Sequence, residues 1–411
     1  MTRLRFLAPD TDAYVASVQR HAAEFEERTG LELDIRIVAS DEYFSNEIHG
    51  YLSGDGVADV YMSGPVLVWE HLDAGFVQPL DDLLDRASDD YRPDDFLHTL
   101  LTVNRWDGAF GTPLGSGPLL EIPVNCESYN LAYVPAHLEA AGVGVPETWD
   151  EFFAAARAAA ASGSCRGFGQ RGAGVWHTMY TGFATQLWSY GATDFEDGRC
   201  AIASDAAVRA TGDFLTALRA AGPEDWPTQR WYELALDFAK GRYALMVDSD
   251  HYVAYFDDPR YSDLVGEIAY APPPSGSAGR RPNLWTWSVV VNARTRDLES
   301  AWRFVEWATS TDFLRRSAYE GNMNPTRRST WDDDEFRAHA QGWDGFYDVA
   351  RDLVEDEATV LVTPAPNYRQ VATRWVEALR EAYAGRCELR EGLEAAAADI
   401  DDLVRAEAVA R

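Results

Sequence analysis

Five polar or aromatic side chains follow the first three strands that the sequence predicts. They are Asp10, Asp12, Glu42, Tyr43 and Ser63. The carboxyl ends of the strands in a doubly wound α/β sheet form the ligand side, so we expect these side chains to line a binding site. Carboxylates, hydroxyls and an aromatic ring together suit a hydroxyl-rich molecule, which needs hydrogen-bond partners and a flat apolar surface. For Asp12, capping of the following helix is an equally good interpretation.

Aromatic residues supply further candidates at a later strand. The chain has 14 tryptophans and 19 tyrosines, and most of them must pack in cores or on the surface. Trp285 and Trp287 alternate around Thr286 at the start of an expected strand, so both face the same side of the sheet. They either line the binding site or pack beneath the second half of the molecule.

Three more candidates follow the apolar segment YALMVDS. Asp250, His251 and Tyr252 come directly after this expected strand and therefore lie at its carboxyl end. A metal-binding role for His251 is disfavoured, because no second histidine or acidic residue stands at ligand spacing. We therefore predict that this turn binds a small molecule.

Two loops complete the set of candidate residues. Ser116 lies in the Gly/Pro-rich segment GTPLGSG, where we expect the chain to cross from one body to another. Glu121 either reaches a ligand hydroxyl or is a solvated strand residue. In the polar loop GNMNPTRRS, Asn322 is a ligand candidate, and Arg327 either binds an acidic group or forms a salt bridge between two bodies.

The sequence contains none of the common catalytic motifs. There is no GxSxG, P-loop, HExxH or dinucleotide-binding glycine pattern, so we predict no catalytic residue and no cofactor. The four cysteines include no CxxC pair, which argues against a metal site. Cys165 and Cys200 form either a disulfide or two independent thiols.

Composition and charge exclude several classes of protein. The hydrophobic content of 46% predicts a globular protein. The length of 411 residues predicts two lobes rather than one core. The 67 acidic and 36 basic side chains give a net charge of -31, which repels nucleic acid and anionic membranes. Lys240 is the only lysine. A saline habitat and a GC-rich coding bias explain this surface equally well.

The predicted elements alternate between strands and helices. Strands at residues 4–8 and 31–39 flank a helix, and a third strand at 57–64 precedes an amphipathic run. This order implies a mainly parallel, doubly wound sheet. A second α/β segment begins near Gly167, and two amphipathic helices split at Gly385 end the chain.

One segment carries a specific family pattern. Residues 104–153 read NRWDGAFGTPLGSGPLLEIPVN, then a Gly-containing link, then PETWDEFF, where Thr148 and Glu151 form a capping box. This order resembles the family 1 extracellular solute-binding proteins of ABC importers, the maltose-binding-protein-like group. AGFVQPLDDLL, FAKGRYALMVDSDHYV, ESAWRFVEWATS and EGNMNPTRRS resemble further segments of the family in the same order.

The resemblance implies a type II periplasmic-binding-protein fold, with two doubly wound α/β lobes and a ligand cleft between them. The expected N-terminal lobe comprises residues 1–114 and 286–316, the C-terminal lobe 117–283 and 320–411, with crossings near 115–116, 284–285 and 317–319. By the same resemblance, Trp176 and His177 open a helix that supplies an aromatic platform. A second aromatic contact falls on His251 or Tyr252, and Trp285 and Trp287 occupy a cleft position.

The implied function is that of a substrate-binding component of an ABC transporter. Such a protein captures a carbohydrate between two closing lobes and delivers it to the permease; the carbohydrate is a monosaccharide, an oligosaccharide or a polyol. The alternatives are a carbohydrate-active enzyme and a two-lobe binder of a polyamine or a phosphodiester. We expect a monomer with no nucleic-acid partner. The resemblance implies an extracytoplasmic location, while the absence of a signal peptide from this sequence leaves a cytoplasmic one open.

Overall fold

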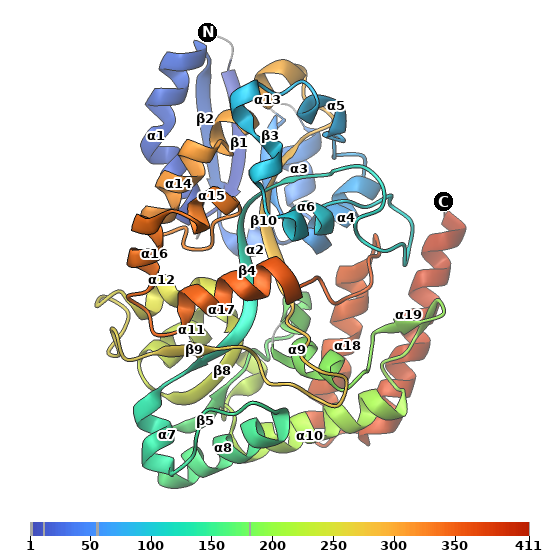
Figure 1. Ribbon diagram of the computed structural model, residues 1–411. Coiled ribbons are helices and arrows are strands. Elements are labelled where there is room, and N and C mark those ends of the chain that lie inside the picture. The colour runs from blue at the N-terminus through green and yellow to red at the C-terminus, as the bar shows by residue number, and fades with distance from the viewer. Residues whose placement is uncertain (1–2, 11–12, 55–56, 181, 411) are drawn as a thin grey trace. The chain divides into compact units, whose positions relative to one another are not determined.

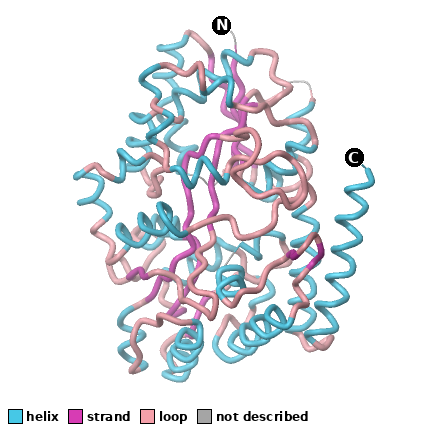
Figure 2. Tube along the Cα trace, turned by 45° about the vertical axis from the view of Figure 1, so that its right-hand side comes forward, coloured by secondary structure: helices cyan, strands magenta, loops and turns pink. Residues whose placement is uncertain are grey.

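The computed structural model describes residues 3–10, 13–54, 57–180 and 182–410 (Figure 1). The chain divides into two compact units. The first unit comprises Met1–Cys126, Trp285–Arg337 and Pro364–Pro366, and the second comprises Glu127–Leu284, Ala338–Thr363 and Asn367–Arg411. In each unit, helices surround the strands (Figure 2). The predicted mixed α/β fold class is confirmed.

The sheet of the first unit has the strand order β2-β1-β3-β10. Its strands are β1 (Arg3–Pro9), β2 (Glu32–Val38), β3 (Val60–Ser63) and β10 (Leu284–Val291). β1 pairs in parallel with both β2 and β3, as the βαβ pattern predicts, whereas β10 is antiparallel to β3. The parallel part of the sheet therefore ends at β3.

Helix α1 (Ala13–Thr29) connects β1 with β2. The other helices and turns of this unit are α2 (Ser40–Tyr43), α3 (Ile48–Ser53), α4 (Pro65–Asp73), α5 (Asp81–Leu84), η1 (Asp89–Tyr91), η2 (Pro93–Asp95), α6 (His98–Val103), α13 (Leu298–Ala308), α14 (Thr311–Tyr319) and α15 (Arg328–Trp331). α16 (Asp334–Ala340) contributes residues to both units.

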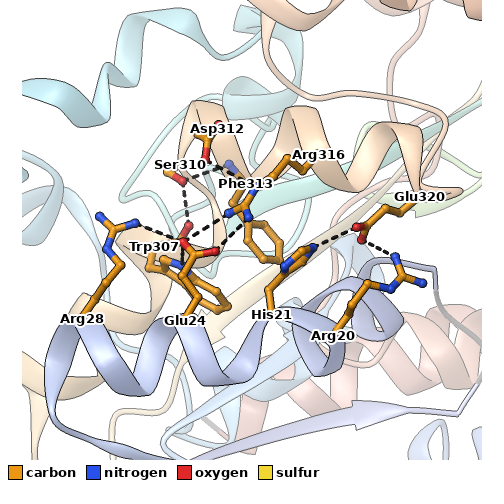
Figure 3. A network of polar contacts seen from close by, with 10 residues as sticks. All are labelled: Arg20, His21, Glu24, Arg28, Trp307, Ser310, Asp312, Phe313, Arg316 and Glu320. Carbon is orange, nitrogen blue, oxygen red and sulfur yellow. Dashed lines mark hydrogen bonds and ion pairs between the residues drawn. The ribbon is translucent and has the colours of Figure 1, made fainter.

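Charged side chains bind α1 to α13 and α14 (Figure 3). Glu24 accepts hydrogen bonds from Arg316, at 2.8 Å, and from Trp307 and Arg28. The hydrogen bond from Arg316, the largest cause, lowers the pKa of the Glu24 carboxyl to about 2. Because most of these side chains are partly exposed, the network orients the helices more than it stabilises the fold.

The second unit has a smaller mixed sheet. β8 (Tyr243–Ser249) pairs in parallel with β5 (Arg166–Gly169) and antiparallel with β4 (Ile122–Tyr133), which also pairs with β9 (Ala269–Ala271). This sheet is therefore not mainly parallel, because β4 enters the unit as a strand running against β8. The first change of unit lies within β4, after Cys126, since residues 104–121 fold back as a hairpin with Arg105 paired to Leu119.

Most of the remaining elements belong to the second unit. They are α7 (Pro135–Ala141), α8 (Trp149–Ser162), η3 (Trp176–Tyr180), α9 (Gly182–Ser189), β6 (Phe195–Glu196), β7 (Arg199–Cys200), α10 (Asp205–Ala221), η4 (Trp226–Thr228), α11 (Trp231–Ala239), η5 (Asp250–Tyr252), α12 (Val253–Phe256), α17 (Phe346–Asp352), η6 (Leu353–Glu357), α18 (Tyr368–Tyr383) and α19 (Leu389–Ala410). The predicted capping box at Thr148 is present. The two C-terminal helices, α18 and α19, are separated at Gly385 and pack against each other. Cys165 and Cys200 are free thiols.

Candidate functional site

The carboxyl ends of β5 and β8 lie side by side in the second unit, because the two strands pair in parallel with Gly169 opposite Met246. The chain segments that leave these ends carry Trp176, His177, Asp250 and Tyr252, all of which the sequence predicted as ligand contacts. Trp176 and His177 lie in a 3-10 turn, η3, rather than at the start of an α-helix. The geometry of this region, which we call the β8 site, is therefore that of a strand-end binding site.

A buried ion pair supports the β8 site from beneath. The Nε atom of Arg171 donates to Oδ2 of Asp248 at 3.0 Å, and its Nη2 atom donates to the Tyr252 hydroxyl at 2.5 Å. Arg171 and Asp248 are both buried, and the Arg171 carbonyl also accepts from the indole N–H of Trp226 at 2.7 Å. The Arg171 guanidinium, which is itself held by Asp248, therefore fixes the orientation of the Tyr252 side chain.

His177 is neutral at physiological pH. Burial is the main cause that lowers its pKa to about 3, and the positive charges of Arg171 and Arg230 lower it further. The indole ring of Trp176 meets the imidazole edge to face, with ring centroids 5.3 Å apart. A neutral imidazole offers one donor and one acceptor nitrogen, the combination that a hydroxyl group can use.

Trp231 is an aromatic residue of the β8 site that the sequence analysis missed. Its ring is nearly parallel to that of Tyr252, with an interplanar angle of 16° and centroids 6.4 Å apart. Trp231 is the first residue of α11 and is partly exposed. The sequence signal that could have revealed Trp231 as a site residue is its position at the start of a helix, directly after Arg230.

Asp250 and His251 make contacts within the second unit, and their ligand contacts stay predictions. Asp250 is buried and accepts hydrogen bonds from the backbone N–H of Ser128, at 3.1 Å, and from the Ser128 hydroxyl. Its carboxylate therefore ties the turn after β8 to β4. The backbone N–H of His251 donates to Ser249 at 3.2 Å, and its imidazole is partly exposed.

In the first unit, the two tryptophans of β10 form an aromatic wall. The ring centroids of Trp285 and Trp287 are 5.6 Å apart, and Phe44 lies 5.8 Å from Trp287. Trp285 is buried against Gly64, where an added Cβ would approach the indole to 2.5 Å, whereas Trp287 and Phe44 are partly exposed. Trp287 and Phe44 are thus the accessible part of the wall.

The opposite face of the same strand carries a buried polar layer. The Asn104 amide donates to the hydroxyl of Ser288 at 3.0 Å and accepts from Thr286 at 2.9 Å. Ser288 stands opposite Ser63 of β3 in the register of the sheet. Ser63 is therefore part of a buried layer, although its hydroxyl has no hydrogen-bond partner among the residues described.

Three more side chains near this layer keep unsatisfied polar atoms. Within the described ranges, the Tyr61 hydroxyl, both carboxyl oxygens of Glu121 and both amide atoms of Asn125 have no hydrogen-bond partner. Burial raises the pKa of Glu121 well above its usual value and thereby favours the neutral form of the carboxyl. Glu121 is accordingly not a solvated strand residue.

The remaining first-unit candidates make local contacts. Asp10 accepts from the backbone N–H of Ser40 at 3.1 Å and from its hydroxyl, and Glu42 accepts from the hydroxyl of Tyr51. Tyr43 is buried and donates to the Met62 carbonyl at 2.5 Å. Asp12 lies outside the described residues.

Three loop candidates are also engaged within the first unit. Ser116 is exposed, and its hydroxyl donates to the Pro113 carbonyl at 2.5 Å. The Asn322 amide donates to the Val124 carbonyl at 2.9 Å.

Arg327 is fully buried, and it donates to the carbonyls of Thr309 and Arg92, so the structure does not support a ligand contact for its guanidinium. Its ion-pair partner at 3.7 Å is Asp95 of the same unit, which also corrects the expected salt bridge between two bodies.

A metal site and a membrane-spanning helix are both missing from the residues that the structure describes. Residues 3–10, 13–54, 57–180 and 182–410 contain no group of three or more His, Cys, Asp or Glu side chains that could hold a metal ion. Over the same ranges, no helix combines the length and the apolar character that a membrane span requires.

Comparison with known proteins identifies the family. Residues 8–313 match the model of the bacterial extracellular solute-binding proteins. The erythritol/L-threitol-binding protein of Mycolicibacterium smegmatis is 29% identical over 384 residues, which cover 90% of this chain and 80% of that protein.

Solved structures share the fold. An ABC-transporter solute-binding protein from Agrobacterium radiobacter in complex with ribitol is 20% identical, with a TM-score of 0.86 over 98% of each chain. Maltose-bound MalE3 of T. maritima is 19% identical, with a TM-score of 0.83 over 98% of this chain and 100% of that one. The predicted resemblance is confirmed, and this chain belongs to the bacterial extracellular solute-binding proteins.

Proposed function

We propose that this protein captures a carbohydrate, most simply a polyol or a small sugar, and delivers it to the permease of an ABC importer. The observation that carries the proposal is the β8 site, which combines aromatic rings with a neutral imidazole and a saturated ion pair. Rings supply flat apolar surface for C–H groups, and the imidazole supplies one donor and one acceptor for hydroxyls. The names of the relatives, which include erythritol-, ribitol- and maltose-binding proteins, support the same class of ligand.

The charge of the β8 site argues against a polyamine. Burial first, and then the positive charges of Arg171 and Arg230, hold the pKa of His177 low, and the Asp248 carboxylate is already paired with Arg171. A polycation needs unpaired carboxylates, so it would bind this region poorly. Because the guanidinium of Arg171 already pairs with Asp248, it has few donors left to bind a phosphodiester.

Isothermal titration calorimetry with a panel of polyols, monosaccharides, disaccharides and polyamines tests the proposal. We expect at least one polyol or sugar to bind with a Kd of about 10 µM or lower, well below 1 mM. Binding of a polyamine with no binding of any hydroxylated ligand would refute the carbohydrate assignment.

The remaining parts of the proposal concern location, partner and activity. We infer that the protein works outside the cytoplasmic membrane as a monomer and releases its ligand without chemical change. The family is one of transport proteins, which supports this inference.

Turnover of a chromogenic glycoside, abolished by replacing one carboxylate, would instead establish an enzyme. Small-angle scattering with and without ligand tests the lobe closure that the resemblance implies.

A further inference from the structure

Three tyrosines form a partly exposed cluster on the second unit, which we call the tyrosine patch. Tyr232 lies on α11, Tyr255 on α12 and Tyr261 in the turn that follows. The ring centroids of Tyr232 and Tyr255 are 5.8 Å apart, and those of Tyr255 and Tyr261 are 5.5 Å apart, both edge to face. Tyr232 is 36% exposed. The patch is therefore a rigid set of rings open to solvent.

Aromatic contacts connect the tyrosine patch to the β8 site without a break. Trp231 meets Tyr232 with ring centroids 5.5 Å apart and lies parallel to Tyr252 on its other side. Tyr252 is the ring that Arg171 holds in place. The ring contacts therefore run in an unbroken series from Tyr252 of the β8 site to Tyr261 of the patch.

The polar groups of the patch also suit a hydroxylated ligand. The guanidinium of Arg260 lies 5.4 Å from the ring centroid of Tyr261 and is held by Asp258, with Nε–Oδ distances of 3.0 and 2.9 Å. In the part of the chain that the structure describes, no residue forms a hydrogen bond with the hydroxyls of Tyr232 and Tyr261. The patch thus presents flat rings, the phenol groups of Tyr232 and Tyr261, and one planar ion pair.

The area of the patch distinguishes a sugar from a protein partner. A buried aromatic side chain covers about 150–250 Å², so three partly exposed tyrosines present on the order of 200–300 Å². A stable protein interface needs about 800 Å² on each partner. The patch is too small for such an interface, but it is large enough for one or two sugar rings.

We propose that the tyrosine patch is an outer subsite that stacks the distal units of an oligosaccharide whose first unit occupies the β8 site. This inference rests on the proposed function and specifies its ligand class. The patch would then extend the range of ligands beyond small polyols, because the distal units of a longer ligand would contact it.

Calorimetric titration with ribitol and with a series of linear oligosaccharides of increasing length tests the inference. For the intact protein we expect affinity to rise with chain length. For the double variant Tyr232→Ala/Tyr261→Ala we expect the longer ligands to bind about three- to tenfold more weakly per ring lost, while ribitol binds as before. Tyr232→Phe keeps the ring and should retain most of the gain.

Tyr319→Ala, which removes an exposed tyrosine of the first unit, is the matched control and should change neither series. Affinity that does not depend on chain length, or an unchanged double variant, would overturn the subsite. Binding of ribitol without any oligosaccharide would overturn it as well, while leaving the proposed function intact. If neither class of ligand bound, both the proposed function and the subsite would fail.

Discussion

The two units bury polar groups in opposite ways. In the second unit, Arg171 and Asp248 are buried together, and each charge has a partner. In the first unit, Glu121 is buried, neither of its carboxyl oxygens has a hydrogen-bond partner among the described residues, and burial raises its pKa well above the usual value. A buried charge is tolerated when it is paired, whereas an unpaired carboxyl becomes neutral. The comparison teaches that the charges beneath the β8 site are paired, whereas the buried carboxyl of Glu121 in the first unit is stabilised in its neutral form.

The largest effect is expected when one member of the Arg171–Asp248 pair is removed. Arg171→Met leaves the Asp248 carboxylate buried and unpaired, which should lower the free energy of unfolding by about 3–5 kcal/mol. Urea denaturation followed by circular dichroism measures the change. Lys240→Met is the control, because the Lys240–Asp263 pair is exposed and should contribute less than about 1 kcal/mol. Equal losses for both variants would contradict the account.

Asp194 sharpens the comparison, because its buried carboxyl has hydrogen bonds but makes no ion pair in the described residues. It accepts from the backbone N–H of Thr363 at 2.8 Å and from its hydroxyl at 2.7 Å. Burial, the largest cause, nevertheless raises its pKa from 3.8 to about 6.

Because this pKa is higher in the folded state than in the unfolded state, the protonated form favours folding. The contribution is present in full below about pH 4 and is lost as pH rises to about 6, a change of about 3 kcal/mol. Asp194→Asn should remove this slope from unfolding free energies measured between those values. A variant with the same slope as the parent protein would show that Asp194 does not titrate there.

A smaller effect is expected at Glu121. Its raised pKa means that the free energy of unfolding declines as pH rises above the usual glutamate range. Glu121→Gln removes the ionisable group but still leaves unpaired polar atoms, so we expect a net gain of about 1 kcal/mol at alkaline pH. Thermal unfolding at neutral and alkaline pH checks this result. A loss of stability at both would indicate that the carboxyl has a partner.

The smallest effect concerns ligand binding and pH. Since the pKa of His177 is about 3, its imidazole stays neutral down to about pH 4, and its folded-state charge does not change in the usual range of histidine titration. We therefore expect the Kd of a polyol to vary less than about twofold between about pH 5 and pH 8. A tenfold weakening near pH 6 would show that a histidine of ordinary pKa controls binding.

The fold was readable from local sequence signals. Alternating strands and helices predicted the α/β class, and the Thr148 capping box predicted the start of α8. The parallel pairing of β5 and β8 then brings together the residues after both strands, as the strand-end rule predicts. The alternation of strands and helices and the capping box depend on neighbouring residues, which is why the sequence revealed them.

The partners of buried polar groups were not readable. Arg171 and Asp248 lie 77 positions apart, and no local pattern links them. Arg327 was predicted as a ligand contact from its polar loop, but its donors reach carbonyls far along the chain, including that of Arg92. Tyr43 was a candidate because it follows a strand, although its hydroxyl is satisfied within the core. Long-range packing decides such cases, and sequence spacing does not report it.

The central claim is that the β8 site binds a carbohydrate ligand through its aromatic rings. Calorimetric titration of the parent protein and of Trp231→Ala with the best polyol or sugar from the panel tests it most directly. Trp231 is partly exposed, so its loss should leave folding intact while weakening binding by about tenfold or more. Unchanged affinity in Trp231→Ala, with the ligand still bound, would contradict the assignment of the β8 site.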